Sequence, residues 1–293
     1  MEKHVSIVGA SGFLGTNLIT YLLEHTDWKI TAISPDPEHV TIEDDRLINL
    51  EGDVFDTTAL QEHISGSHVV YYFVHMMGAD GDYFELEEEA SRSMGRAAEN
   101  ARVGRIIDMS GLGKDTDNLS KHLASRHNAG RVLREFQTSV IEFRASMIVG
   151  EGSISFQIVK NLAEKLRILI MPITAETCTQ PIGITDMLTY LHVAATVEID
   201  GDKIVEVGGP EVVSYAELIL MYSQWSGDST TVICTRLLPP FIAGLLLRLF
   251  NPPHVAKVGR AMVDSFRNEM IVTDYTHKIL FPDITPGLIE NDF

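Results

Sequence analysis

The sequence predicts an α/β fold in which helices cover both faces of one parallel sheet and a smaller, mainly helical carboxyl-terminal lobe follows. Two observations predict it. Short β-branched segments alternate with amphipathic segments through the first half of the chain, and a glycine-rich turn follows the first of them. This rhythm is typical of parallel strands joined by right-handed crossover helices. The expected strands are residues 5–8, 30–33, 46–50, 69–74, 105–109 and 140–143.

The expected helices lie between these strands and in the second half. Each has apolar residues at three-and-four spacing with polar residues between them. In the first half they are residues 13–25, 84–102 and 122–137, and in the second half 155–166, 186–197, 214–225, 241–250 and 254–266. One more strand, at 203–207, is expected to rejoin the sheet before the pattern changes beyond residue 208.

Composition and charge exclude several classes of function. The chain has 293 residues, of which 41 are acidic and 23 basic, giving a net charge of −18. Such a surface repels nucleic acid and anionic membranes. The apolar segment at 237–250 contains two prolines and an arginine and is too short to cross a bilayer. We read it as a core or dimer-contact helix rather than an interfacial one, and predict no membrane partner.

The sequence also bears on where the protein is located and on whether it binds a metal. The amino terminus shows no export signal. Cys178 and Cys234 are far apart and outside any CxxC pattern, which favours a reducing cytoplasm. The histidines lack HExxH spacing, and we read the acidic run Glu85, Glu87, Glu88 and Glu89 as a solvated helix face. No metal site is predicted.

The strongest motif is the glycine-rich turn between the first strand and the first helix. Gly9 can adopt the positive φ of a tight turn, Gly12 lets the backbone approach a diphosphate, and Gly15 lets helix and strand pack closely. Unpaired amides at the helix start then face the phosphates, against a repulsive overall charge. The alternative is a turn without a ligand. The predicted dinucleotide contacts are Gly9, Ser11, Gly12, Phe13, Leu14 and Gly15.

Two acidic positions bear on which dinucleotide binds. Asp53, followed by Val54, lies after the third strand, where its carboxylate could accept a hydrogen bond from an adenine amino group, or could cap a turn. Asp36 follows the second strand, where NADP requires a positive charge for its extra phosphate. Asp36 favours NAD weakly over NADP, unless it only starts a proline-rich turn or Arg46 folds back toward the site.

With these motifs, most of the chain resembles the atypical, NmrA-like branch of the short-chain dehydrogenase/reductase superfamily. The resemblance also rests on YYFVHMMG (71–78), DMSGLG (108–113), HLASR (122–126), FRASMIVG (143–150), QPIGITD (180–186) and GGPE (208–211). It implies an NAD(P)-binding Rossmann domain formed by residues 1–151 and completed by 183–208. Residues 152–182 and 209–293 would then form a substrate lobe.

The resemblance also implies catalytic residues, and here the sequence departs from the family. Active members use Ser, Tyr and Lys, the last two as YxxxK on one helix. Ser110 matches the serine, but His122 stands at the tyrosine position and Arg126 at the lysine position. A histidine can exchange a proton near neutral pH, whereas arginine stays charged. One interpretation makes His122 the acid/base, Ser110 the carbonyl-orienting group and Arg126 a ribose clamp; in the other, both helix residues are structural.

Three functions therefore remain open from sequence. The first is an NAD(P)-dependent oxidoreductase acting on a small carbonyl or alcohol. The second is a non-catalytic nicotinamide redox sensor that binds a protein partner, and the third an epimerase or dehydratase with tightly held cofactor. The family pattern adds His75 and Met147 as cofactor contacts through their backbone. The helices at 84–102 and 122–137 are where family dimers often meet, so a homodimer is possible.

Overall fold

The computed structural model describes residues 3–79, 81–238, 252, 255, 259 and 264–293. The predicted helix at 241–250 lies outside these residues, and most of the one at 254–266 does as well. Among the described residues, no helix has both the length and the apolar composition needed to span a bilayer.

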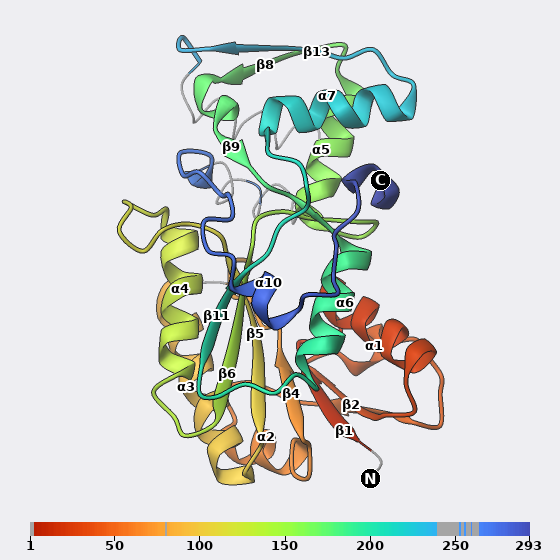
Figure 1. Cartoon of the computed structure of the whole chain (residues 1–293), viewed down its shortest axis with the longest axis vertical. Coiled ribbons are helices and arrows are strands. Elements are labelled where there is room, and N and C mark those ends of the chain that lie inside the picture. Colours follow the sequence, from red (N-terminus) through yellow and green to blue (C-terminus); the bar gives the residue numbers. More distant parts are fainter. Residues whose placement is uncertain (1–2, 80, 239–251, 253–254, 256–258, 260–263) are drawn as a thin grey trace.

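A seven-stranded parallel sheet forms the centre of the molecule (Figure 1). Its strand order is β11-β6-β5-β4-β1-β2-β3, so the chain starts in the middle of the sheet and winds outward in both directions. The strands are β1 (His4–Val8), β2 (Lys29–Ser34), β3 (Leu47–Glu51), β4 (Val69–Tyr72), β5 (Arg105–Gly111), β6 (Ser139–Ala145) and β11 (Lys203–Glu206). The predicted fold class is confirmed.

Helices cover both faces of this sheet. Helices α1 (Phe13–His25) and α6 (Ile184–Ala194) lie on one face, while α2 (Thr57–His63), α3 (Tyr83–Ala101) and α4 (Lys121–Leu133) lie on the other (Figure 1). The strands bury side chains on both faces: Ile7 packs with Leu18 of α1, whereas Val70 packs with Met94 of α3. The inner strands β1, β2 and β4 are therefore buried along most of their length, as expected for a parallel sheet covered on both faces, whereas the edge strand β3 is largely exposed.

The lobe stands at one end of the sheet and has its own hydrophobic core (Figure 1). Helices α5 (Ile154–Lys165) and α7 (Tyr215–Ser226) pack together beneath a parallel pair, β8 (Ile168–Pro172) and β13 (Thr231–Thr235). Short strands lie between the sheet and the lobe: β7 (Ile148–Val149), β9 (Cys178–Thr179), β10 (Ile182–Gly183) and β12 (Val213–Ser214). The remaining short elements are η1 (Pro37–His39) between β2 and β3, η2 (Ile173–Glu176) within the lobe, α10 (Thr276–Leu280) beside β11, and η3 (Ile289–Asp292) near the carboxyl terminus.

The predicted elements of the first half all occur. Every predicted sheet strand starts within one residue of its expected position, and α1 has the expected bounds. Helix α4 ends four residues before its predicted end at residue 137. The sequence does not predict α2, β8 or β13. The division into residues 1–151 with 183–208, and 152–182 with 209–293, stays a prediction.

Candidate functional site

The glycine-rich turn is packed too tightly for side chains. Gly9 has a φ of +89°, and a Cβ there would lie 3.0 Å from the carbonyl of Phe73. A Cβ on Gly15 would lie 2.6 Å from the Gly9 carbonyl oxygen. The Gly9 amide donates to the Ile33 carbonyl at 3.0 Å, which ties the turn to β2. The turn is therefore held by three neighbouring strands and the first turn of α1.

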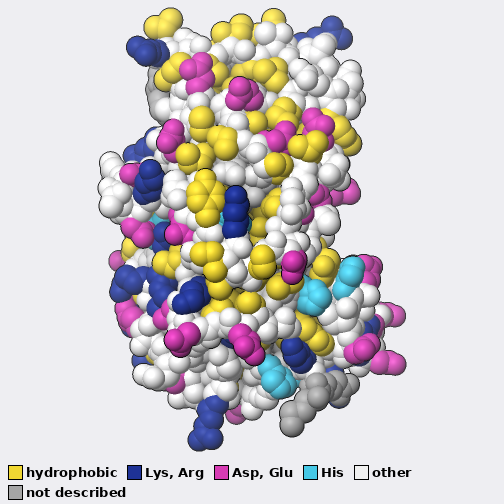
Figure 2. Space-filling view, in the orientation of Figure 1, with side chains coloured by type: hydrophobic (Ala, Val, Ile, Leu, Met, Phe, Trp, Pro, Cys, Tyr) yellow, Lys and Arg dark blue, Asp and Glu magenta, His cyan; other side chains and the backbone are white. Residues whose placement is uncertain are grey.

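The amino terminus of α1 lacks a side-chain cap. Its N-cap is Gly12, whereas Asp56, Asp82 and Ser120 cap α2, α3 and α4 with their side chains. Phe13, Leu14 and Gly15 form the first turn of α1, whose amides have no carbonyl one turn earlier to bind. These amides and the helix dipole supply local positive potential. Elsewhere the surface carries acidic side chains over both the sheet and the lobe (Figure 2).

A cleft of about 450 Å³ opens beside this turn, at the carboxyl edge of the sheet. Ends of β1, β2, β3 and β4 form its walls. The predicted cofactor contacts Gly9, Ser11, Gly12, Asp53, Val54 and His75 line it, together with Val8, Ile33, Ser34, Pro35, Gly52, Phe55, Phe73, Val74 and Met76. The other predicted contacts, Phe13, Leu14, Gly15, Asp36 and Met147, are not among its lining residues. The glycine cradle, the uncapped helix and this cleft together fit a dinucleotide.

The two acidic positions have different surroundings. The Asp53 carboxylate accepts a hydrogen bond from the Phe55 amide at 2.9 Å and also lines the cleft, so the turn-capping alternative and the adenine contact are compatible. The Asp36 side chain is 73% exposed, and its carboxylate lies 3.9 Å from the His39 ring. Arg46 does not fold back: its guanidinium binds Asp44 and the carbonyls of Thr26 and Leu23.

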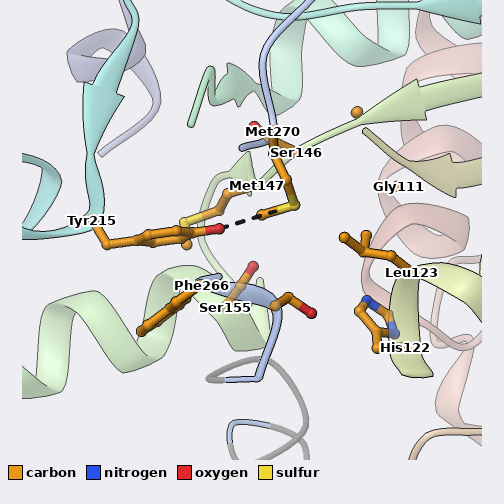
Figure 3. A pocket seen from close by; sticks show the side chains of 11 residues that line it. Gly111, His122, Leu123, Ser146, Met147, Ser155, Tyr215, Phe266 and Met270 are labelled. Carbon is orange, nitrogen blue, oxygen red and sulfur yellow. Dashed lines mark hydrogen bonds between the residues drawn. The ribbon is translucent and has the colours of Figure 1, made fainter. Parts of the chain in front are cut away.

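A second, smaller hollow of about 60 Å³ lies between the sheet and the lobe (Figure 3). His122 and Leu123 of α4 form one side, and Tyr215 and Phe266 from the lobe region lie opposite them. The Tyr215 hydroxyl points toward the Met270 sulfur, 4.0 Å away (Figure 3). The remaining lining residues are Gly111, Ala145, Ser146, Met147, Ser155 and Ser265. We call this hollow the apolar pocket.

Three of the buried polar atoms that have no hydrogen-bond partner among the described residues lie in or next to the lining of the apolar pocket. His122 Nδ1 and Ser146 Oγ belong to lining residues, and Ser110 Oγ belongs to the residue before Gly111, which lines the pocket. An unpaired buried polar atom costs about 1–3 kcal/mol, so such groups normally have a ligand or an ordered water beside them. Ser146 and Tyr215 were not predicted as site residues, and neither belongs to a motif with a recognised chemistry.

His122 is kept neutral in this environment. Burial, together with the neighbouring His75 and Arg126, lowers the pKa of His122 to about 3. Its ring stacks on that of His75 with centroids 5.1 Å apart and planes within 4° of parallel. A neutral imidazole can still donate or accept a hydrogen bond, but it holds no spare proton at neutral pH.

The buried Arg126 guanidinium interacts with two main-chain carbonyls and two carboxylates. It donates to the carbonyls of Val74 and Met109, and it lies 3.7 Å from Glu87 and 3.6 Å from Asp108. Burial raises the pKa of Asp108 to about 7, although Arg126 opposes the shift. The predicted contact of Arg126 with a ribose remains untested, but the contacts present join the ends of β4 and β5 to α3 and α4.

The sequence predicts that the acidic run Glu85, Glu87, Glu88 and Glu89 is a solvated helix face. This prediction is wrong for Glu87, whose side chain is 2% exposed. Its carboxylate contacts His75 at 2.7 Å and accepts hydrogen bonds from Ser125 and the Met76 amide. Burial alone would raise the pKa of Glu87, but His75 and Arg126 outweigh it and lower the pKa to about 2. The spacing of Glu87 from Ala90, Met94 and Ala98, all buried on α3, could have revealed its inward face.

Comparisons with known proteins agree with this geometry. Residues 9–147 match the family described as NAD(P)H-binding. This segment, which is just under half of the chain, contains the glycine-rich turn and β2 to β6. The match supports NAD(P) binding by this part of the chain. Among the described residues, no group of three or more His, Cys, Asp or Glu side chains could hold a metal ion.

Single proteins that resemble this chain have low sequence identity to it. A ceramide reductase from Caulobacter vibrioides is 27% identical over 154 residues, which cover 50% of this chain and 47% of the relative, so the match spans about half of each. The NADPH-dependent quinone oxidoreductase QOR2 from Escherichia coli has 16% identity and a TM-score of 0.77, covering 98% of this chain and 97% of its own. A nucleoside-diphosphate-sugar epimerase from Staphylococcus aureus has 16% identity and a TM-score of 0.75, covering 99% and 98%. These two structures share the fold with this chain.

Proposed function

We propose that the protein is an NAD(P)-dependent oxidoreductase that interconverts a carbonyl group and an alcohol on a small, largely apolar substrate. The observation that carries the proposal is the set of unpaired buried atoms, Ser110 Oγ, His122 Nδ1 and Ser146 Oγ, around a mainly apolar pocket beside the cofactor cleft. Hydroxyl and imidazole N–H groups are the donors that a carbonyl oxygen requires.

The residues around the cleft have distinct roles in this proposal. Amides of residues 9–15 hold the diphosphate, and Asp53 and Val54 lie beside the adenine. Ser110 and His122 orient the reacting oxygen, and Met147 contacts the nicotinamide end. A bound nicotinamide supplies or accepts a hydride. Because Arg126 already contacts two carbonyls and two carboxylates, we propose that it positions these loops as well as facing the ribose.

The substrate class follows from the lining of the apolar pocket. Leu123, Met147, Tyr215, Phe266 and Met270 present mostly apolar surface. Its small volume suits the carbonyl end of a molecule rather than a whole nucleotide sugar. The resemblance to a ceramide reductase also supports a carbonyl attached to an apolar chain.

Cofactor titration and a substrate screen test this proposal. Calorimetry with NAD, NADH, NADP and NADPH measures which form binds, and we expect NADH to bind below millimolar and more tightly than NADPH, because Asp36 repels the extra phosphate. Loss of absorbance at 340 nm is then followed with ketones of increasing chain length, quinones and nucleotide sugars. Consumption of the reduced cofactor with an apolar ketone is the expected result.

The other outcomes separate the alternatives. Binding that differs between oxidised and reduced cofactor without any turnover would indicate a redox sensor. Conversion of a nucleotide sugar without net change in the cofactor would indicate an epimerase or dehydratase. If no dinucleotide binds below about millimolar, the assignment of the cleft is wrong.

A further inference from the structure

The stacked histidines span the boundary between the two hollows. His75 lines the cofactor cleft and His122 lines the apolar pocket. Their rings are parallel within 4° and their centroids are 5.1 Å apart. His75 follows β4, whereas His122 is the second residue of α4, so two distant segments supply the pair. Any reaction between a group in the cleft and one in the pocket takes place beside these imidazoles.

A buried carboxylate holds the first of these rings. Glu87 Oε1 lies 2.7 Å from His75 Nδ1. Ser125, the Met76 amide and Arg126 fix the orientation of the Glu87 carboxylate. A carboxylate placed on Nδ1 orients an imidazole and stabilises its protonated form, which leaves Nε2 as the atom that exchanges a proton.

We propose that His75, held by Glu87, is the catalytic proton donor and acceptor of this site, and that His122 orients the substrate oxygen as a neutral imidazole. This inference rests on the proposed oxidoreductase function. It reassigns the acid/base role that the family alignment suggests for His122.

The proposed reaction needs a hydride, which a nicotinamide would supply, and a proton, which His75 supplies. In reduction, a nicotinamide held in the cleft would supply a hydride to the carbonyl carbon as the C=O π bond breaks. Its electron pair moves to the oxygen, which takes the proton from His75 Nε2. The products are the alcohol, the oxidised nicotinamide and a neutral His75, and Glu87 stays a carboxylate. Solvent then reprotonates His75, and oxidation of the alcohol runs through the same steps in reverse.

Exposure favours His75 over His122 for this role. The His75 side chain is 36% exposed and can exchange its proton with water, whereas His122 Nδ1 is buried without a partner. Protonating His122 would also place a third positive charge beside Arg126 and a protonated His75. These groups, with burial, are what lower the pKa of His122.

The pH dependence has a definite sign. The charged and titratable groups facing His75 are Glu87 from α3, and Arg126 and His122 from α4. Burial and Arg126 lower the pKa of His75, and Glu87 partly opposes them, so the pKa lies below its usual value. Reduction needs the protonated ring, so kcat/KM for reduction falls as the pH rises through this pKa. Glu87→Gln removes the opposing charge and moves that fall to lower pH.

Turnover of three variants tests the catalytic role. His75→Asn should lower kcat for carbonyl reduction about 100-fold or more, with dinucleotide Kd within threefold of wild type, since a general acid contributes about 10² to 10⁴ in rate. His122→Ala should raise KM more than it lowers kcat and should keep the pH midpoint. The control is His68→Asn, because His68 immediately precedes β4 and is exposed at the opposite end of the strand from His75. It should leave kcat unchanged.

A second measurement does not depend on turnover. Protein labelled with [15N]histidine and saturated with the dinucleotide is titrated by NMR, and Glu87→Gln should lower the titration midpoint of His75 by about one pH unit or more. Glu135→Gln is the control, because Glu135 is an exposed carboxylate that pairs with Arg92 and Arg131. If Glu87→Gln does not fold, His75→Asn still decides the catalytic role.

The results separate this inference from the function on which it rests. Retention of a third or more of wild-type kcat in His75→Asn, or a His75 midpoint unmoved in folded Glu87→Gln, would overturn it while leaving the oxidoreductase intact. A wild-type protein that binds the dinucleotide but reduces no carbonyl would refute the oxidoreductase and this catalytic role together. The NMR titration would then still decide whether Glu87 controls the proton on His75.

Discussion

The cofactor cleft and the apolar pocket adjoin each other but are built differently. The cleft lies at the ends of four neighbouring strands, and its glycine-rich turn brings main chain into contacts that leave no room for a Cβ. The apolar pocket is formed mainly by side chains from α4, the end of β6 and the segment after it, α5, α7, and Ser265, Phe266 and Met270. The shape of the cleft at the glycine-rich turn depends on a few φ angles and on the absence of Cβ atoms. The shape of the apolar pocket depends instead on how segments distant in the sequence pack together.

This difference determines what substitution can do in each region. In the cleft, an added methyl group displaces backbone and affects every dinucleotide alike. In the pocket, a side chain can change while the fold persists, so substrate choice and proton transfer can vary independently of cofactor binding.

The largest effect is expected where the cleft has no room for a Cβ. Gly9→Ala combines an unfavourable φ of +89° with a contact 3.0 Å from the Phe73 carbonyl, so the turn must move. We expect dinucleotide affinity to fall more than 100-fold by calorimetry. Gly66→Ala is the matched control, because Gly66 has a φ of +80° but open space around it. It should lose about 1 kcal/mol of stability and no affinity; equal losses of affinity in both variants would contradict the cradle.

The next effect concerns Glu87, which joins the two regions. The folded protein lowers its pKa to about 2, so its carboxylate stabilises the fold above the unfolded value of 4.5. That stabilisation is lost as the pH falls from 4.5 toward 2, and it amounts to about 2–3 kcal/mol. Urea unfolding at several pH values should therefore show a smaller acid-dependent loss for Glu87→Gln than for wild type.

The control for this measurement lies on the same helix. Glu89 of α3 is exposed, so Glu89→Gln should follow the wild-type curve. Parallel curves for wild type and Glu87→Gln would mean that the carboxylate is not held as the structure describes.

The same contrast explains what the sequence could and could not predict. The strands and the glycine turn depend on residues adjacent in the chain, so their positions follow from local periodicity. Glu87 appears in an acidic run, and although its helical spacing from Ala90 and Met94 indicates an inward face, its partners on α4 and after β4 meet it only in the folded chain. The β8–β13 pair joins segments about 60 residues apart through lobe contacts that local pattern does not encode. The stacking of His75 on His122 likewise requires the tertiary fold.

The smallest effect concerns the choice between NAD and NADP. Asp36 follows Pro35, which lines the cleft, and its side chain is 73% exposed, so solvent screens its repulsion of an extra phosphate. Asp36→Ala should therefore raise NADPH affinity only about three- to tenfold and leave NADH affinity within about twofold. Asp45→Ala is the control, because it removes the same charge from the loop before β3. If both variants gain equally, the effect comes from net charge, which at −18 repels any dinucleotide; a gain confined to Asp36→Ala would place the ribose of the adenosine beside this carboxylate.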